Sequence, residues 1–177
     1  NAAYYAGAPK LDRFEIHAYP DEASLLKALR SGELSGASGL SPTVAPTIDL
    51  ARYKLTPQAL NSGVYLLFNM NNPILKDAKV RKALQAATDT AALRSDIGGG
   101  VLPLDAPILS SQLDGADVPQ VAPPDIARAQ ALLDEAGWKM SGSGRMRDGQ
   151  ALGFTITTTK NSENLRSIDN LAKQWRK

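Results

Sequence analysis

Seven consecutive, mostly apolar residues, GVYLLFN at positions 63–69, restrict the fold of this chain more than any other stretch. An uninterrupted apolar run of this length is typical of a strand that is covered on both faces. A helix is expected to follow, because apolar residues recur at helical spacing after Asp77, which can cap the first turn. Its stripe consists of Val80, Ala83, Leu84, Ala87 and Ala91. A buried strand that leads into such a helix predicts an α/β protein.

The first forty residues predict a second pairing of strands with a helix. Residues 11–19 alternate in polarity, as a half-buried strand does, and the segment PDEASLLKALRSG follows as a helix that Asp21 can cap and Gly32 can end. The apolar stripe of this helix is Leu25, Leu26 and Leu29. Residues 33–40 are then expected to form a short strand, which completes a βαβ unit.

Residues 41–62 contain three prolines and little periodicity, so a domain boundary is expected near residue 60. A surface excursion rich in Gly, Pro and Asp is expected over residues 97–124. The next helix has the stripe Ile126, Ala129, Leu133 and Ala136, with Gly137 at its end. The segment SGSGRMRDGQALGFTITTT predicts a hairpin with Phe154 and Ile156 facing inward, and residues 163–177 predict a final amphipathic helix.

The overall charge excludes a dedicated nucleic-acid binder. The chain carries 20 Lys and Arg against 18 Asp and Glu, spread along its length, so no segment produces a sustained basic field. It contains no cysteine, which excludes disulfides, thiolate metal sites and cysteine nucleophiles. No stretch approaches the roughly 20 apolar residues of a membrane span. These observations favour a globular protein that does not act on nucleic acid.

The candidate chemical motifs each have a simpler explanation. His17 is the only histidine and the chain has no cysteine, so a metal site is not expected. The IGGGV segment lacks the Gly-Lys-Ser/Thr of a phosphate-binding loop, and SGLSP is not a Gly-x-Ser-x-Gly elbow. Arg81 and Lys82 lie off the apolar stripe of their helix, where a solvated face is expected. With no nucleophile, acid pair or metal cluster, we expect neither an enzyme nor a bound cofactor.

Three segments together resemble a known family. The opening NAAYYAGAPKLDRFEIHAYPDEASLLKALRSGEL, the central LLFNMNNPILKDAKVRKALQAATD, and DIARAQALLDEAGW followed by GRMRDGQALGFTITTT are similar to motifs of the extracellular solute-binding proteins of family 5. These are the dipeptide, oligopeptide and nickel receptors of ABC importers. The chain departs from the family pattern at Ser35, at Ala2 and Ala3, and at Ile74 and Leu75. The signature includes an arginine at position 81, whose partner the sequence does not reveal.

The resemblance implies a periplasmic-binding-protein-like fold of type II, an α/β architecture of two lobes that is present here as a partial chain. Residues 1–60 would belong to lobe I and residues 61–177 to lobe II, with the apolar strand crossing between them. Complete members are about three times longer, so this chain resembles their middle. The absence of an initiator Met and the end of the chain within a helical pattern also lead us to expect an excised piece.

The resemblance also implies a function: the substrate-binding component of an ABC importer, with small peptides bound in a cleft between the lobes. The expected ligand contacts are Ser38, Gly39 and Leu40 after the first unit, Tyr65 on the crossover strand and Asn69 at its exit. Small residues allow a peptide backbone to approach, and a tyrosine can pack on it and form a hydrogen bond. For Tyr65, simple packing in the core is the alternative.

Two further functions remain open at this point. One is a nickel or metal-chelate receptor of the same family, and the other is an excised structural lobe that binds no ligand and pairs its sheet with another copy. The expected partners are the solute and the membrane permease of the importer. The expected location is the periplasm or the cell exterior, with membrane attachment through a lipid anchor in the full-length lipoprotein.

Overall fold

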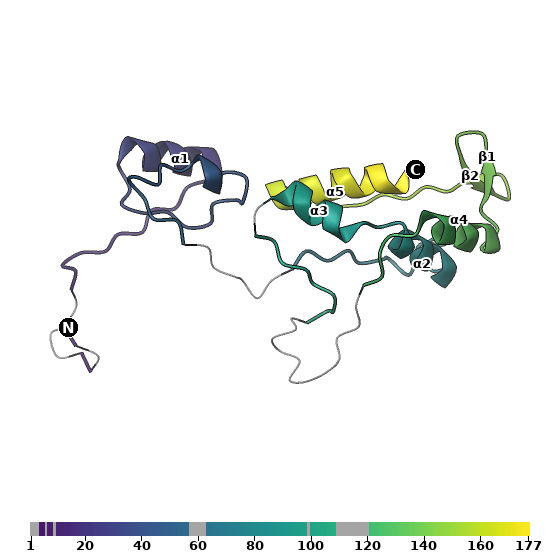
Figure 1. Ribbon diagram of the computed structural model, residues 1–177, viewed down its shortest axis with the longest axis horizontal. Coiled ribbons are helices and arrows are strands. Elements are labelled where there is room, and N and C mark those ends of the chain that lie inside the picture. The colour runs from purple at the N-terminus through teal and green to yellow at the C-terminus, as the bar shows by residue number, and fades with distance from the viewer. Residues whose placement is uncertain (1–3, 6, 9, 57–62, 99, 109–120) are drawn as a thin grey trace. The chain divides into compact units, whose positions relative to one another are not determined.

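The computed structural model describes residues 4–5, 7–8, 10–56, 63–98, 100–108 and 121–177. It divides into two compact units, Asn1–Leu40 and Ser41–Lys177, which are described separately (Figure 1). This division falls after Leu40, whereas the sequence led us to expect a boundary near residue 60. The expected boundary concerns the lobes of an intact receptor, and it stays a prediction.

The N-terminal unit contains the helix α1, Glu22–Ser31, bounded as the sequence predicts. The Asp21 carboxylate accepts a hydrogen bond of 2.8 Å from the Ser24 amide, which satisfies one of the free N–H groups of the first turn. Gly32 ends the helix with a φ of 83°, a conformation that costs other residues energy. Ala28 and Leu29 are buried, and Leu25 and Leu26 are half-buried.

The prediction of a strand on either side of α1 is wrong. Neither residues 11–19 nor residues 33–40 form a strand, and Phe14 and Ile16, on the apolar side of the alternating segment, are 78% and 84% exposed. Alternating polarity is a local property, whereas a strand also requires a partner whose backbone completes the ladder. No strand occurs among the described residues of this unit, so the predicted βαβ unit is not formed.

The C-terminal unit contains four α-helices and one short 3₁₀-helix among its described residues. They are η1 (Ala45–Thr47), α2 (Ala78–Ala86), α3 (Thr90–Ile97), α4 (Ile126–Glu135) and α5 (Ser162–Trp175). Each α-helix begins with a polar cap whose side-chain oxygen accepts a backbone N–H, and these caps are Asp77, Asp89, Asp125 and Asn161. Helix α2 packs against α4, and α3 packs against α5 (Figure 1).

The single helix predicted from Asp77 to Ala91 is interrupted. Helix α2 ends at Ala86, and α3 begins at Thr90 with Asp89 as its cap. The Thr88 hydroxyl lies between the two helices and donates a 2.7 Å hydrogen bond to the Leu84 carbonyl. Asp and Thr side chains compete with the helical backbone for hydrogen bonds, which explains the break. Ala91, expected in the apolar stripe, is therefore exposed.

The predicted hairpin is confirmed and is part of a small antiparallel sheet. Its strands are β1 (Lys139–Ser141), β2 (Gly144–Arg147) and β3 (Gln150–Ala151), in the order β1-β2-β3. The turn between β2 and β3 has Asp148 at φ 52° and Gly149 at φ 76°, as a two-residue hairpin loop requires. Phe154 and Ile156 are half-buried, as predicted, although they lie beyond the last strand.

The core of this unit forms where α2, α4 and the start of the hairpin meet. Val80 and Trp138 are fully buried, and they cluster with Ile74, Leu75 and Leu84. The partly buried residues packed against this cluster are Phe68, Leu133, Ala136, Leu152, Phe154 and Trp175. Most of the predicted stripes of α2 and α4 therefore face inward, but Ile126 at the start of α4 is 41% exposed.

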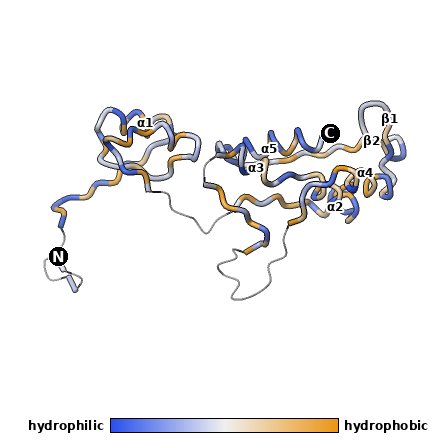
Figure 2. The backbone as a smooth tube through the Cα atoms, viewed as in Figure 1, coloured by the Kyte–Doolittle hydropathy of each residue, from blue (hydrophilic) through white to orange (hydrophobic). Residues whose placement is uncertain are grey.

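The prediction of a strand over residues 63–69 is also wrong. The segment runs into the turn before α2 without a strand partner among the described residues. Val64 is 54% exposed and Leu67 is 88% exposed, although both are apolar. Figure 2 shows hydrophobic residues along this segment. An apolar run indicates residues whose burial would be favourable, but it does not supply the neighbours that would bury them.

Helix α5 is attached to the junction of α2 and α3 by two polar side chains at its end. The Gln174 side chain accepts from the Asp89 amide at 2.6 Å and donates to the Asp89 carbonyl at 3.1 Å. The Trp175 indole N–H donates to the Leu84 carbonyl at 3.1 Å and to the Thr88 hydroxyl at 3.0 Å. These contacts join residues more than 80 positions apart.

Candidate functional site

The expected ligand contacts are divided between the two units. Ser38, Gly39 and Leu40 belong to the N-terminal unit, where Ser38 and Gly39 are exposed and Leu40 is half-buried. Gly39 has a φ of 79°, and a Cβ added there would meet no atom within 4 Å. The left-handed φ by itself accounts for a glycine at this position, and the space beside it is open. Tyr65 and Asn69 lie in the C-terminal unit.

Tyr65 is exposed and tied to a distant loop. Its ring is not part of the core, since the residue is 51% exposed. The hydroxyl donates a 3.1 Å hydrogen bond to the carbonyl of Pro107, a residue 42 positions later. A Cβ added to nearby Gly63 would collide with the Leu104 side chain, so the segments around residues 63–65 and 104–107 lie against each other. Because the hydroxyl proton is used, the Tyr65 hydroxyl can only accept a hydrogen bond from a ligand.

The side chain of Asn69 can donate hydrogen bonds to a ligand, whereas the Tyr65 hydroxyl can accept them. Its Oδ1 accepts a 3.0 Å hydrogen bond from the Asn71 amide, which fixes the orientation of the side-chain amide, because only an oxygen can face that N–H. The Nδ2 group has no partner among the residues that the structure describes, and Asn69 is exposed. Among the described residues, Asn69 therefore has side-chain donors without a partner, whereas the Tyr65 hydroxyl can still accept a hydrogen bond.

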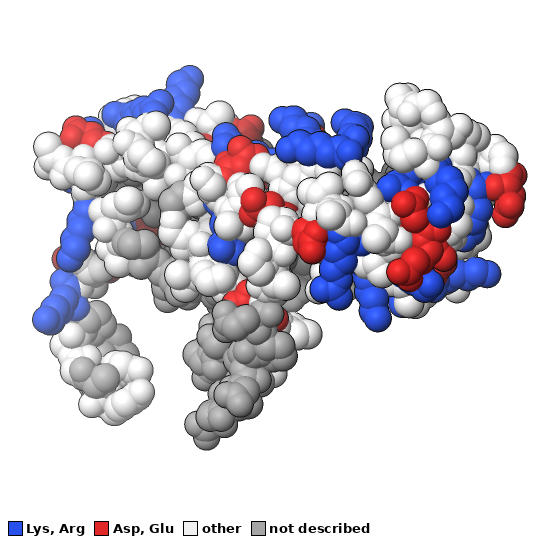
Figure 3. All heavy atoms as spheres, turned by 45° about the vertical axis from the view of Figure 1, so that its right-hand side comes forward, with Lys and Arg blue, Asp and Glu red and all other residues white. Residues whose placement is uncertain are grey.

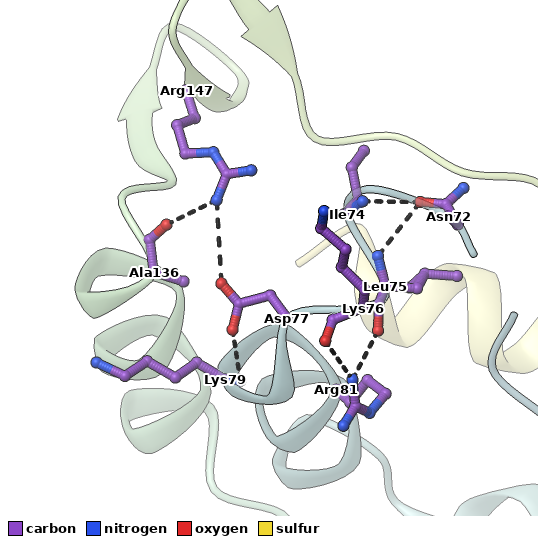
Figure 4. A network of polar contacts seen from close by, with 9 residues as sticks. All are labelled: Asn72, Ile74, Leu75, Lys76, Asp77, Lys79, Arg81, Ala136 and Arg147. Atoms are coloured by element: carbon purple, nitrogen blue, oxygen red, sulfur yellow. Dashed lines mark hydrogen bonds and ion pairs between the residues drawn. The ribbon is translucent and has the colours of Figure 1, made fainter. Parts of the chain in front are cut away.

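The turn between Asn69 and α2 contains the partner of Arg81. Figure 4 shows the Arg81 guanidinium directed at two carbonyls of this turn: Nη1 lies 2.9 Å from the Leu75 oxygen and 2.8 Å from the Lys76 oxygen. Asn72 Oδ1 accepts from the amides of Ile74 and Leu75, at 2.9 and 3.2 Å. The expectation that Arg81 lies on a solvated face is therefore wrong, because Arg81 is half-buried; Lys82 is exposed as expected.

A second network holds the start of α2 against α4 (Figure 4). Asp77 caps α2 through the Lys79 amide at 2.8 Å, and its other carboxylate oxygen lies 4.0 Å from Arg147 Nη1. The same Arg147 nitrogen donates to the Ala136 carbonyl at 3.1 Å, and the guanidinium carbon lies 4.5 Å from the centre of the Trp138 ring. These partners explain Asp77 and Arg147 structurally, without a ligand.

In the N-terminal unit, the surroundings of Tyr19 and Asp21 shift the pKa values of these two side chains. Partial desolvation and a 3.0 Å hydrogen bond to Glu33 raise the pKa of Tyr19. Backbone and side-chain hydrogen bonds from Ser24 lower the pKa of Asp21, as expected for a helix cap. Both shifts follow from local structure and neither belongs to an expected ligand contact.

Other kinds of site find little support within the described ranges. These residues include no group of three or more His, Cys, Asp or Glu that could hold a metal ion, and His17 lies 3.7 Å from a Glu15 oxygen on the surface. A shallow surface hollow is lined by Leu50–Leu55, one continuous stretch that includes none of the expected contacts. On the face seen in Figure 3, basic and acidic side chains are interspersed. No described helix has both the length and the apolar character needed to cross a membrane.

The family is now established by comparison. The chain belongs to the bacterial extracellular solute-binding proteins, family 5 (middle part), whose model matches residues 1–177. The members of this family are transport receptors outside the cytoplasm, and the family implies a periplasmic-binding-protein-like fold. No solved structure matches the chain significantly.

Several curated relatives are similar over most of the chain. Protein XP55 of Streptomyces lividans is 31% identical over 88% of this chain and 29% of its own length. The oligopeptide-binding protein AppA of Bacillus subtilis is 27% identical over 92% of this chain and 31% of its own. A putative ABC transporter peptide-binding protein of Brucella ovis is 31% identical over 81% of this chain and 27% of its own. The chain thus spans less than a third of the length of these relatives.

Proposed function

We propose that this chain is the central part of the substrate-binding component of an ABC importer and that the intact receptor binds small peptides. The observation that carries the proposal is the family match over all of residues 1–177, together with relatives that are named as oligopeptide-binding and peptide-binding proteins. A receptor of this kind performs no covalent chemistry. It changes between open and closed states, and the ligand stabilises the closed state by binding it more tightly.

We place the peptide in a cleft between two lobes, in contact with Ser38, Gly39, Leu40, Tyr65 and Asn69. The hydrogen-bonding capacity of the last two supports this choice. The Tyr65 hydroxyl has lone pairs to accept an N–H, and the Asn69 amide, which has no partner within the described part of the chain, can donate to a carbonyl. A peptide unit offers both groups, an N–H that donates and a carbonyl that accepts.

The remaining partners follow from the same role. The closed receptor would deliver its peptide to a membrane permease, which distinguishes it from the open form by shape. Its place of action would be the periplasm or the cell surface, where a lipid anchor on the full-length protein would hold it near the permease.

Thermal unfolding of the intact receptor with and without peptide tests the proposal. A pool of di- to pentapeptides at a hundredfold excess over the dissociation constant should stabilise a competent receptor by about 2.7 kcal/mol. Asn69→Asp is the matched variant: its carboxylate still accepts the Asn71 amide, but the donor is lost. We expect an unchanged unfolding temperature without peptide and a smaller peptide-induced shift. A folded receptor that no peptide stabilises would contradict the proposed function.

A further inference from the structure

We propose that Arg81 is a positioning residue for the ligand site: with Asn72 it holds the turn before α2 and thereby fixes the orientation of Asn69. This inference rests on the proposed function, because Asn69 is the ligand contact through which Arg81 acts. It gives a role to the one feature of the central signature that the sequence left without a partner.

Arg81 binds backbone carbonyl groups of the turn. Its Nη1 donates to the oxygens of Leu75 and Lys76, which precede it by six and five residues. Hydrogen bonds from a charged donor are roughly twice as strong as neutral ones, and arginine remains charged at any physiological pH. A side chain within α2 is therefore bonded to the segment that leads into that helix (Figure 4).

Asn72 binds backbone amide groups of the same turn. Its Oδ1 accepts from Ile74 and Leu75, and its own carbonyl accepts a 2.9 Å hydrogen bond from the Lys76 amide. Leu75 is thus bonded through both of its backbone groups, its N–H to Asn72 and its C=O to Arg81. The Ile74 and Leu75 side chains are 3% and 6% exposed, so the turn is also anchored in the core.

The hydrogen bonds continue from this turn to Asn69. The Asn72 amide donates to the Asn69 carbonyl at 3.1 Å, and the Asn71 amide donates to Asn69 Oδ1 at 3.0 Å. A connected path therefore joins Arg81, Leu75, Asn72 and Asn69. At its buried end the path is fixed by packing, and at its exposed end it sets which way the Asn69 donors point.

Positioning of this kind increases affinity because less freedom is lost on binding. A donor that already points toward the ligand need not be ordered when the complex forms. If the turn loosens, the Asx-type contact between Asn69 and Asn71 loosens with it, and the side chain samples other orientations. The cost then appears in the dissociation constant, even when the receptor stays folded.

Peptide affinity of the intact receptor, measured by calorimetry, tests this role. We expect Arg81→Gln to weaken binding about five- to tenfold, the equivalent of about one hydrogen bond. Lys82→Gln removes the neighbouring charge, which is exposed, and should leave affinity unchanged. Asn72→Ala should weaken binding as Arg81→Gln does, whereas Asn72→Asp, which keeps the acceptor oxygen, should retain it. Unchanged affinity in Arg81→Gln would overturn the proposal, even if stability falls.

A double-mutant cycle separates positioning from a general loss of structure. Once Asn69→Ala has removed the contact, adding Arg81→Gln should change affinity less than about twofold. An equal loss in both backgrounds would mean that Arg81 does not act through Asn69 and would overturn the proposal.

Amide hydrogen exchange without ligand distinguishes this proposal from the proposed function. In Arg81→Gln, the Leu75 and Asn71 amides should exchange faster, while an amide in α5 should be unaffected. If the wild-type receptor binds no peptide, the proposed function fails and the positioning of a ligand contact fails with it. If peptide binds and these exchange rates do not change, only the positioning role is overturned.

Discussion

At the scale of single residues, polar side chains in this protein mostly bond to backbone groups and not to one another. Asn72, Arg81 and Gln174 each satisfy two backbone atoms in turns or at helix junctions. Such contacts specify local geometry strongly, because a backbone group left without a partner away from water costs free energy. Arg81 is an example, since its guanidinium binds the Leu75 and Lys76 carbonyls.

Asp21 provides a prediction about pH. Hydrogen bonds from Ser24 lower its pKa in the folded state, so the folded protein binds this proton less readily than the unfolded chain does. The contribution of the cap is therefore complete above the unfolded pKa, near pH 4, and is lost as the pH falls through the lower folded pKa. NMR titration of the Asp21 carboxyl and the Ser24 amide should show this transition.

Asp21→Asn is the control for that titration. The amide oxygen still caps α1, but it does not titrate in this range. The Ser24 amide shift should then be independent of pH in the acid range. An Asp21 pKa at or above the ordinary value would contradict the cap geometry.

At the scale of elements, the helices could be predicted and the isolated strands could not. Asp21, Asp77 and Asn161 lie within a few residues of the groups that they cap, so sequence and structure carry the same local information. A strand depends on a partner elsewhere in the chain. The hairpin of β2 and β3 was predicted correctly because only a two-residue turn separates the two strands. Residues 11–19 and 63–69 have no strand partner among the described residues.

The candidate site could also be predicted only where it depends on residues near one another in the sequence. Tyr65 and Asn69 were selected through a family resemblance, and the sequence could not indicate that one would offer an acceptor and the other a donor. That difference depends on Pro107, 42 residues away, and on the turn at Asn71. The partner of Arg81 was missed because carbonyl directions in a turn are not visible in a helical pattern. Proline at position 73 and the amides around it were the available signal of that turn.

The packing of α2 gives a prediction at this scale. Leu84 is 6% exposed in the cluster around Trp138. Leu84→Ala should lower the free energy of unfolding by about 2–5 kcal/mol, since it removes buried methyl groups and leaves a cavity. Its backbone carbonyl, which Trp175 uses, is retained. Lys82→Ala on the exposed face of α2 should change stability by less than about 0.5 kcal/mol, and equal effects in urea unfolding would contradict this packing.

At the scale of the whole molecule, the two units differ in how much core they contain. Among the described residues, the buried apolar side chains of the N-terminal unit are Ala28 and Leu29. Those of the C-terminal unit are Ile74, Leu75, Val80, Ala83, Leu84, Ile97, Ala129, Trp138 and Leu171. A chain of about 40 residues with so small a core does not normally fold alone.

Separate expression of the two units tests this difference. We expect residues 41–177 to unfold cooperatively in urea, with Trp138 shielded from a fluorescence quencher in the folded state. Residues 1–40 alone should show only partial helix and no cooperative transition. A cooperative transition in the short fragment would mean that its exposed apolar residues find a core that this structure does not contain.

We propose that the receptor containing this chain binds peptides through contacts that include Asn69. Isothermal titration calorimetry of the intact receptor, with di- to pentapeptides added one at a time, tests it most directly. We predict saturable heat with one peptide bound per receptor, and weaker binding of the same peptide in Asn69→Asp at unchanged stability. A folded receptor that gives no saturable heat with any peptide of the set would contradict the proposed peptide binding.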